Sequence, residues 1–363
     1  VPDTAHSWVN TPRQKFESYL HYLAVNRYQV IALRDLQKYV DPEIAPLNHA
    51  QVIEDRQAAI AAKRSLDNFR TPNNDDDLRF WLSNMLTHEF DVFEMATATG
   101  LTPGDVQDAL TRFSLAPTDQ PLRTESGLTV LPYPGGRHPR IGFRDGAIRP
   151  QRETKISVFA PWKDGGYVVA DTPEAIWWKQ TDKPELLYLA HTHVTTVWDR
   201  KKIQLTQQEW NRETDGRYFI ERELPNGVKF GAEIRPQPAA VLMELWITNG
   251  TERPIRDLRV QNCVMLKAAT GFSELSDENK IYRSPYAACR SNDGSRWVIT
   301  AWEQCQRPWG NRHCPCLHSD PQFPDCMPGE TQRLKGWLSF YEGEDIESEL
   351  SRIKSLSWRS QTE

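Results

Sequence analysis

Two histidines separated by one residue, His191 and His193, are the residues best placed to do chemistry. On a β-strand, residues two apart project from the same face, so both imidazoles are able to reach one metal ion. Glu209 offers a carboxylate and His318 a third imidazole, with zinc as the candidate metal. Hydrogen bonding to a sugar and a structural role are the alternatives. In a catalytic cleft, the candidate catalytic residues are His191, His193, Glu209 and Arg152.

The cysteines form the second group with chemical potential. In an exported protein they predict disulfides that staple a proline-rich loop over residues 306–328. A zinc site that uses cysteines of this loop together with His313 or His318 is the alternative, and free thiols are the third interpretation. Cys263 lies in an apolar run and is expected to be a buried free thiol. The candidates for disulfide or zinc are Cys289, Cys305, Cys314, Cys316 and Cys326.

Basic and aromatic side chains suggest where a sugar would bind. An arginine fork can hold the carboxylate of an acidic sugar in two hydrogen bonds, and surface ion pairs are the alternative use of the same residues. The chain has 13 tryptophans, whose rings can stack on the apolar face of a sugar or fill a core. The substrate-binding candidates are Arg137, His138, Arg140, Trp198 and Trp210.

Short strands separated by turn residues must position these groups. Strand-like runs recur at residues 155–160, 166–171, 186–193, 218–223, 241–248, 258–266, 296–301 and 334–341. Glycine, asparagine and aspartate turns separate them with no helix between, a pattern typical of an antiparallel β-sandwich. Met243, Leu245 and Ile247 alternate with more polar residues, as in a half-buried strand. We therefore expect a sandwich over residues 128–345 and a helix with a tail over 346–363.

The first part of the chain reads differently. Thr11 and Pro12 open a helix, residues 28–33 predict a buried strand, and residues 35–39 a further turn of helix, which together make an α/β fragment over residues 1–41. A helical linker is expected over residues 42–74. A helical unit over 75–127 has a helix-turn-helix order, but Asp105 and Asp108 on its second helix favour docking or spacing over DNA binding.

Motifs at the start of the chain carry a resemblance to a known family. These are VPD at residues 1–3, HSWVNTP at 6–12 and VIALRDL at 30–36. In order and spacing this stretch resembles the closing part of a polysaccharide deacetylase domain. That family deacetylates N-acetyl sugars with a divalent metal, and its catalytic motifs lie upstream of the matching stretch. The resemblance implies that this chain is the C-terminal part of an exported bacterial protein and accompanies the deacetylase centre.

The rest of the chain resembles uncharacterised C-terminal regions that accompany such deacetylases, through PYPGGRHPRIGF at residues 132–143, QRETK at 151–155 and the cysteine-rich tail. This similarity implies no catalytic residue.

Composition narrows the function classes. The net charge is −5 with acidic and basic residues interspersed, so nucleic acid is an unexpected partner. No apolar run approaches the ~18 residues that a membrane span needs. We expect a mainly β, secreted or periplasmic protein whose sandwich binds a polysaccharide or oligosaccharide as an accessory region. The alternatives are that the sandwich is itself a carbohydrate-active hydrolase, lyase or epimerase, or a structural module at the cell surface.

Overall fold

The computed structural model divides the chain into two compact units, residues 1–63 and 64–363, which we describe separately. The residues it describes are 13–25, 30–38, 69–117, 123–124, 127–137, 139, 153–179, 183–190, 194–312 and 314–359. Residues 42–68 of the predicted helical linker lie outside them, and its described part, residues 69–74, is not helical.

The first unit contains helix α1 (Arg13–Val25) and a short 3-10 helix, η2 (Leu33–Lys38). The strand predicted over residues 28–33 is wrong for its described part, because residues 30–32 adopt no regular structure. Val30 and Leu33 are 72% and 88% exposed. An apolar run becomes a buried strand only where a neighbouring strand and a core accept it, and local sequence does not encode that partner.

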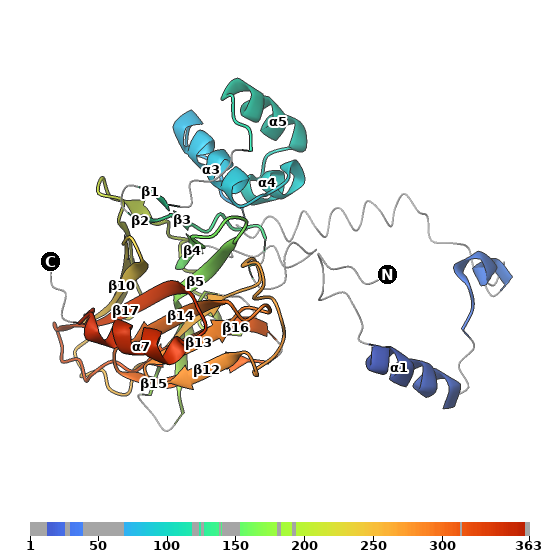
Figure 1. The fold of residues 1–363 in the computed structure, drawn as a ribbon. Helices are drawn as coiled ribbons and strands as arrows, with labels where there is room; N and C mark the ends of the chain where they lie inside the picture. Colours follow the sequence, from blue (N-terminus) through green and yellow to red (C-terminus); the bar gives the residue numbers. More distant parts are fainter. Residues whose placement is uncertain are drawn as a thin grey trace. The chain divides into compact units, whose positions relative to one another are not determined.

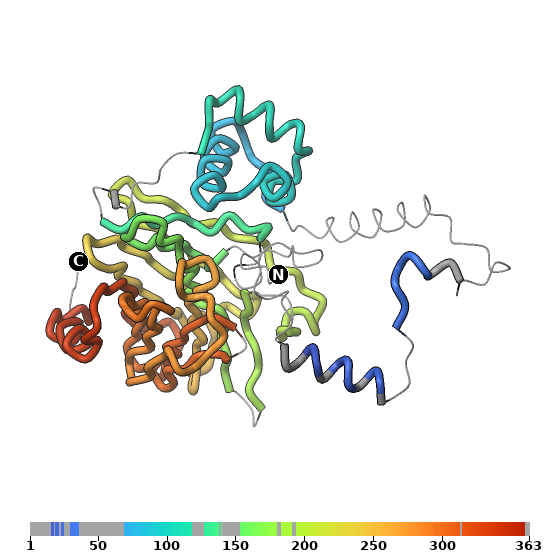
Figure 2. The backbone as a smooth tube through the Cα atoms, turned by 45° about the vertical axis from the view of Figure 1, so that its right-hand side comes forward, coloured from blue at the N-terminus to red at the C-terminus, as the bar shows by residue number. Residues whose placement is uncertain are grey.

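Three short helices begin the second unit and pack as one cluster (Figures 1 and 2). They are α3 (Asp75–Thr87), α4 (Val92–Thr99) and α5 (Pro103–Arg112). Each helix is preceded by a residue whose side chain accepts a hydrogen bond from the first turn: Asn74, Asp91 and Thr102. Asp91 and Glu94 also form a reciprocal capping box. Helix α4 ends at Gly100, whose φ of +76° is the left-handed conformation that glycine adopts readily. The apolar side chains of α3 are buried among the three helices.

Two antiparallel sheets make up most of the second unit (Figure 1). The eight-stranded sheet has the order β12-β13-β14-β17-β10-β9-β8-β7. Its strands are β7 (Asn211–Arg212), β8 (Tyr218–Glu223), β9 (Val228–Pro236), β10 (Ala240–Asn249), β12 (Lys280–Arg283), β13 (Tyr286–Arg290), β14 (Arg296–Trp302) and β17 (Thr331–Glu342).

The seven-stranded sheet has the order β15-β16-β11-β5-β4-β3, with β6 also paired to β5. Its strands are β3 (Val130–Pro132), β4 (Lys155–Phe159), β5 (Tyr167–Trp178), β6 (Glu185–Leu189), β11 (Arg259–Met265), β15 (Cys305–Asn311) and β16 (Cys314–Pro321). A separate two-stranded ribbon pairs β1 (Arg123–Thr124) with β2 (Gly127–Leu128). A short helix, α6 (Val197–Arg200), follows β6 in the sequence.

The main core lies between the two sheets, so the predicted β-sandwich is confirmed. Inward-facing residues such as Met243, Leu245 and Ile247 are 0–3% exposed, as their alternation predicted. The outer face of the eight-stranded sheet is covered by helix α7 (Ile346–Ser355), which packs Ile346, Leu350 and Ile353 against sheet residues. None of the helices in the described residues is long and apolar enough to cross a membrane.

The proline-rich segment at 306–328 departs from expectation. Instead of a loop held by disulfides, its first part forms β15 and β16, which pair with each other, and β16 pairs with β11. Within the described residues no cysteine forms a disulfide, so that prediction is wrong for the structure. Strand pairing fixes this segment, and its cysteines are spread over different faces. Cys326 lies in the core between the sheets, as does Cys289 from β13, whereas Cys314 and Cys316 lie on the outer face of the seven-stranded sheet.

Candidate functional site

A pocket of about 490 Å³ lies where helix α3 meets the sandwich, and we call it the junction pocket. Helix α3 and the segment before it form one wall, and residues 207–218 with Pro132 form the other. Four aromatic rings line it, from Phe80, Trp81, Trp210 and Tyr218. Its polar lining comes from Arg70, Thr71, Asn73, Asp77, Gln207, Glu209 and Arg212. Rings and convergent polar groups in a pocket of this size are typical of small-molecule sites.

Arg70 organises the junction pocket. Its Nε donates to Glu209 Oε1 at 3.1 Å and its Nη2 donates to Oε2 at 3.0 Å. Its guanidinium carbon lies 3.4 Å from the centroid of the Trp81 ring, and Nη1 donates to the Pro134 carbonyl. The Arg70 side chain is 5% exposed and that of Glu209 is 41% exposed. The two-pronged bond therefore fixes a partly exposed carboxylate at the edge of the pocket.

The two candidate tryptophans occupy different places. Trp210 lines the junction pocket, is 8% exposed, and donates its Nε1–H to the Lys155 carbonyl at 3.0 Å. This bond holds the indole at one orientation. Trp198, on α6, is 3% exposed and donates to the Leu187 carbonyl at 2.7 Å. It belongs to the core and does not line the pocket.

Arg137 fastens the helices to the chain that enters the sandwich. Its Nε donates to Glu94 Oε1 at 2.8 Å, and its Nη1 and Nη2 donate to the carbonyls of His88 and Glu89, each at 3.1 Å. Its guanidinium carbon also lies 4.2 Å from the centroid of the Phe90 ring. Arg137 therefore makes contacts within the protein, although the sequence offered it as a sugar ligand.

His88 is a second connection between helices and sheet. It is fully buried, and its Nε2 lies 2.7 Å from Ser157 Oγ while its Nδ1 lies 2.8 Å from the Asn84 carbonyl. Burial, the largest influence, lowers the pKa of His88 to about 3, with a smaller contribution from the charge of Arg137. The ring is therefore neutral at ordinary pH.

A row of polar side chains crosses the outer face of the seven-stranded sheet, and we call it the buried row. Lys155 pairs with Asp171, Asp171 with Cys263, and Cys263 with His318 in the strand registers. Lys155 Nζ lies 2.6 Å from Asp171 Oδ1, and both side chains are 0% exposed. Trp309 is the last residue of the row. It pairs with His318 in the strand register, and the two rings are stacked with their centroids 3.9 Å apart. Side chains opposite each other on neighbouring strands share one face, so this row is a direct result of register.

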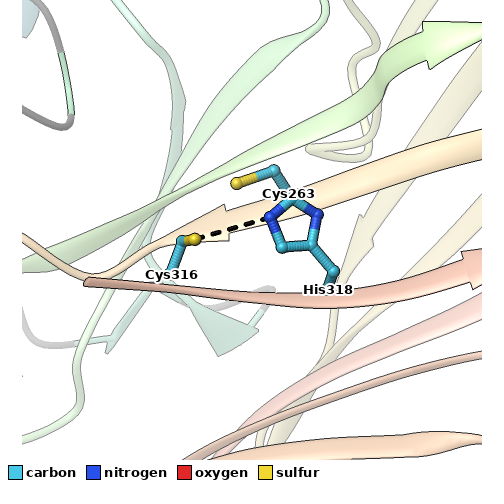
Figure 3. Close-up of side chains that lie close together, drawn as sticks. All are labelled: Cys263, Cys316 and His318. Atoms are coloured by element: carbon cyan, nitrogen blue, oxygen red, sulfur yellow. Dashed lines mark hydrogen bonds between the residues drawn. The ribbon is translucent and has the colours of Figure 1, made fainter. Parts of the chain in front are cut away.

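Cys316 lies beside the row, and together with Cys263 and His318 it forms a cluster of metal-ligand type (Figure 3). Hydrogen bonds with the thiols of Cys263 and Cys314, and with His318, hold the pKa of Cys316 well below its usual range, although burial opposes the shift. Burial lowers the pKa of His318, but contacts with Asp320 and Cys316 outweigh it and raise that pKa to about 10. Both shifts favour placing the proton that the pair shares on His318 rather than on Cys316.

The structure distributes the predicted site residues as follows. Glu209 and Trp210 meet in the junction pocket, whereas His318 and Cys316 meet at the buried row. His191, His193, Arg152, His138 and Arg140 lie outside the described residues. Cys305 and Cys326 do not join Cys316 in its cluster. Sequence reasoning missed Arg70, Trp81 and the Lys155–Asp171 pair, and it treated Cys263 as a structural thiol. One sequence signal could have indicated a metal site here. Cys314, Cys316 and His318 alternate along one run and therefore share one face of a strand, although the sequence does not show that Cys263 lies opposite them.

Comparisons with known proteins complete the description. No protein-family model matches the sequence, and no curated protein matches it. A solved "Polysaccharide Lyase BACCELL_00875" is 11% identical, with 61% of this chain and 34% of that chain covered and a TM-score of 0.34. A putative aldose 1-epimerase from Escherichia coli K12 is 8% identical, with 46% and 79% covered and a TM-score of 0.32. A putative kojibiose phosphorylase from human microbiome is 6% identical, with 53% and 25% covered and a TM-score of 0.31.

Proposed function

We propose that this protein binds a carbohydrate, an oligosaccharide or a segment of polysaccharide, in the junction pocket. The observation that carries the proposal is the pairing of four aromatic rings with charged and amide side chains around one open volume of about 490 Å³. A sugar ring offers an apolar face to aromatic side chains and hydroxyl groups to polar ones, so it needs both kinds of partner together.

The charged groups of the pocket favour binding over hydrolysis. Glycoside hydrolysis uses two carboxyl groups, one of which donates a proton. The pocket has two carboxylates, but Glu209 is held by Arg70 and Asp77 accepts from the backbone and side-chain nitrogens of Asn73 at 2.9 and 3.1 Å. An ionised carboxylate in such contacts only accepts hydrogen bonds. Both groups are suited to holding sugar hydroxyls.

The accessory role belongs to the same proposal. On this view the protein is secreted or periplasmic and holds polysaccharide for a deacetylase that acts on it. The resemblance of residues 1–36 to deacetylases supports this part of the proposal, which is tested by assaying deacetylation of chitin oligomers with and without the pocket intact.

Calorimetric titration of the whole chain tests the binding proposal. Chito-oligosaccharides, uronic-acid oligomers and neutral glucans are the ligands, and one class is expected to bind. The exposed side chains Asn73 and Arg212 line the pocket. For N73A and R212A we expect about a tenfold loss of affinity each, the worth of one hydrogen bond.

The matched control is Trp198→Phe, a buried tryptophan that does not line the pocket, and its affinity should equal that of the unaltered protein. Binding that survives N73A, R212A and the double variant unchanged would place the sugar elsewhere. Failure of the unaltered protein to bind any of the three classes would reject the proposal.

A further inference from the structure

We propose that Cys263, Cys316 and His318 bind a zinc ion on the outer face of the seven-stranded sheet. The site lies on β11 and β16, apart from the junction pocket, and the inference does not depend on carbohydrate binding.

The donor atoms already have the spacing of a coordination shell. The two Sγ atoms and a ring nitrogen of His318 all lie within 4.8 Å of one another, and Cys316 Sγ lies 3.4 Å from His318 Nε2 (Figure 3). Tetrahedral zinc with its usual bond lengths places a sulfur and a nitrogen ligand about 3.5 Å apart. Only a small approach of the three side chains is needed to enclose an ion.

The strand register explains why these three residues meet. Cys316 and His318 are two apart on β16 and therefore project from one face, and Cys263 lies directly opposite His318 on β11. A register irregularity between Gln261 and Cys263, where β11 pairs with β5, lies beside the cluster. Such bulges re-aim side chains next to functional sites.

Burial and charge favour a metal over unpaired thiols. Each of the three residues is 2% exposed. Two thiolates and one neutral imidazole neutralise a divalent ion completely, so the loaded site carries no net charge into the interior. Binding releases two protons, one from the Cys263 thiol and one from the hydrogen-bonded Cys316–His318 pair, and leaves His318 to coordinate through Nε2 as a neutral ring.

The surroundings of His318 match those of a metal-bound histidine. Its other nitrogen, Nδ1, faces Asp320 Oδ1 at 3.7 Å and Glu174 Oε2 at 3.9 Å. These carboxylates are themselves positioned, since Trp309 Nε1 donates to Asp320 at 2.5 Å and Gln261 donates to Glu174 at 2.6 Å. Metal-bound histidines typically donate their second ring N–H to a carboxylate, and both separations here are longer than a hydrogen bond, so a small rotation of the ring is needed to complete that contact.

Two other uses of the cysteines fit less well. A Cys263–Cys316 disulfide would have to join diagonal positions, because Cys316 lies opposite Met265 and not opposite Cys263. Diagonal residues of antiparallel strands are about 7–8 Å apart, beyond the reach of an unstrained disulfide. A nucleophilic cysteine needs access for a substrate, which 2% exposure and the stacked Trp309 ring oppose.

Cys314, which lies outside the cluster of three, is the candidate for a fourth ligand, and as a third thiolate it would give the loaded site one negative charge. It is on the same face of β16, two residues before Cys316, and its thiol is in hydrogen-bond contact with that of Cys316. A Cys3His set is one of the usual closed zinc sites.

Metal analysis of the whole chain tests the proposal. We expect one zinc ion for each chain after purification without chelator, and a thiolate-to-metal charge-transfer absorption when cobalt(II) replaces zinc. C263S and C316S should each lower the affinity for zinc at least about tenfold. Loss of a residue that only hydrogen-bonds to a metal ligand already has an effect of this size. C289S is the matched control, because Cys289 is a buried cysteine of β13 outside the cluster.

Three results would overturn the proposal. The first is that the unaltered protein binds no zinc and shows no charge-transfer band with cobalt(II). This result does not depend on whether any variant folds. Another is zinc bound equally by C263S, C316S and C289S. The third is a Cys263–Cys316 disulfide in peptides mapped from unreduced protein.

Discussion

The junction pocket and the buried row both gather charged side chains, but they differ in their contact with water. In the pocket, the Glu209 side chain is 41% exposed, and its partner Arg70 donates to the carboxylate while its guanidinium stacks on the Trp81 ring. In the row, Lys155 and Asp171 are 0% exposed and contact each other at 2.6 Å. A partly exposed carboxylate can exchange water for a ligand, whereas a sealed pair can only hold the structure or an ion. Similar residue types therefore serve different purposes because of where the sheets place them.

Removing one partner of the sealed pair is the strongest way to test this contrast. Lys155→Met leaves the carboxylate of Asp171 buried without its counter-charge, and we expect a loss of about 3–5 kcal/mol in the free energy of unfolding. Urea denaturation followed by circular dichroism measures it. The double variant K155M/D171L removes both charges and should recover most of the loss. A single variant as stable as the unaltered protein would show that Lys155 and Asp171 are not paired in the folded state.

The pH dependence of the free energy of unfolding tests whether His88 is buried between the helices and the sheet. The pKa of His88 in the folded protein is about 3, below its usual 6.5, so the unfolded chain binds the proton more readily. Stability from this group is complete above pH 6.5 and is lost as pH falls towards 3, at up to about 1.4 kcal/mol for each pH unit.

Denaturation at pH 7, 6 and 5 should show that slope in the unaltered protein and a smaller one in H88Q. The glutamine amide keeps hydrogen-bonding capacity towards Ser157 without taking up a proton. Equal slopes in the two proteins would mean that His88 is accessible to protons in the folded state.

The smallest effect is expected at the junction pocket. Arg70→Lys keeps the charge but loses the two-pronged bond to Glu209 and the flat stack on Trp81, so we expect a loss of about 1–2 kcal/mol. Thermal unfolding monitors this change, and limited proteolysis monitors release of the three helices. If R70K were as damaging as K155M, the pocket would be as sealed as the buried row, and the contrast between the two regions would fail.

The sandwich was predictable because its strands carry local signals. Alternating apolar residues and glycine or asparagine turns predicted β8 residue for residue, and β10 to within one residue at each end. The prediction for residues 306–328 was wrong because prolines are typical of loops, whereas this segment contains strands. Pro308 lies on β15, an edge strand, where a missing backbone N–H is tolerated.

The candidate sites were harder to predict because they depend on register and long-range contact. Glu209 was found from its residue type, but its partner Arg70 is 139 positions away. Cys263 meets His318 only because β11 and β16 pair in one register, and a shift of one residue would turn their side chains to opposite faces. A single sequence records which side chains alternate, but it does not record which strand lies opposite.

Helix α7 has a consequence for how the protein is made. The face that it covers carries Tyr286, Trp297 and Trp337, and the helix follows β17 in the chain. As the polypeptide emerges during translation, the sheet is synthesised before its cover. This aromatic face is therefore open to chaperones, or to other nascent chains, until the residues after 345 have been added.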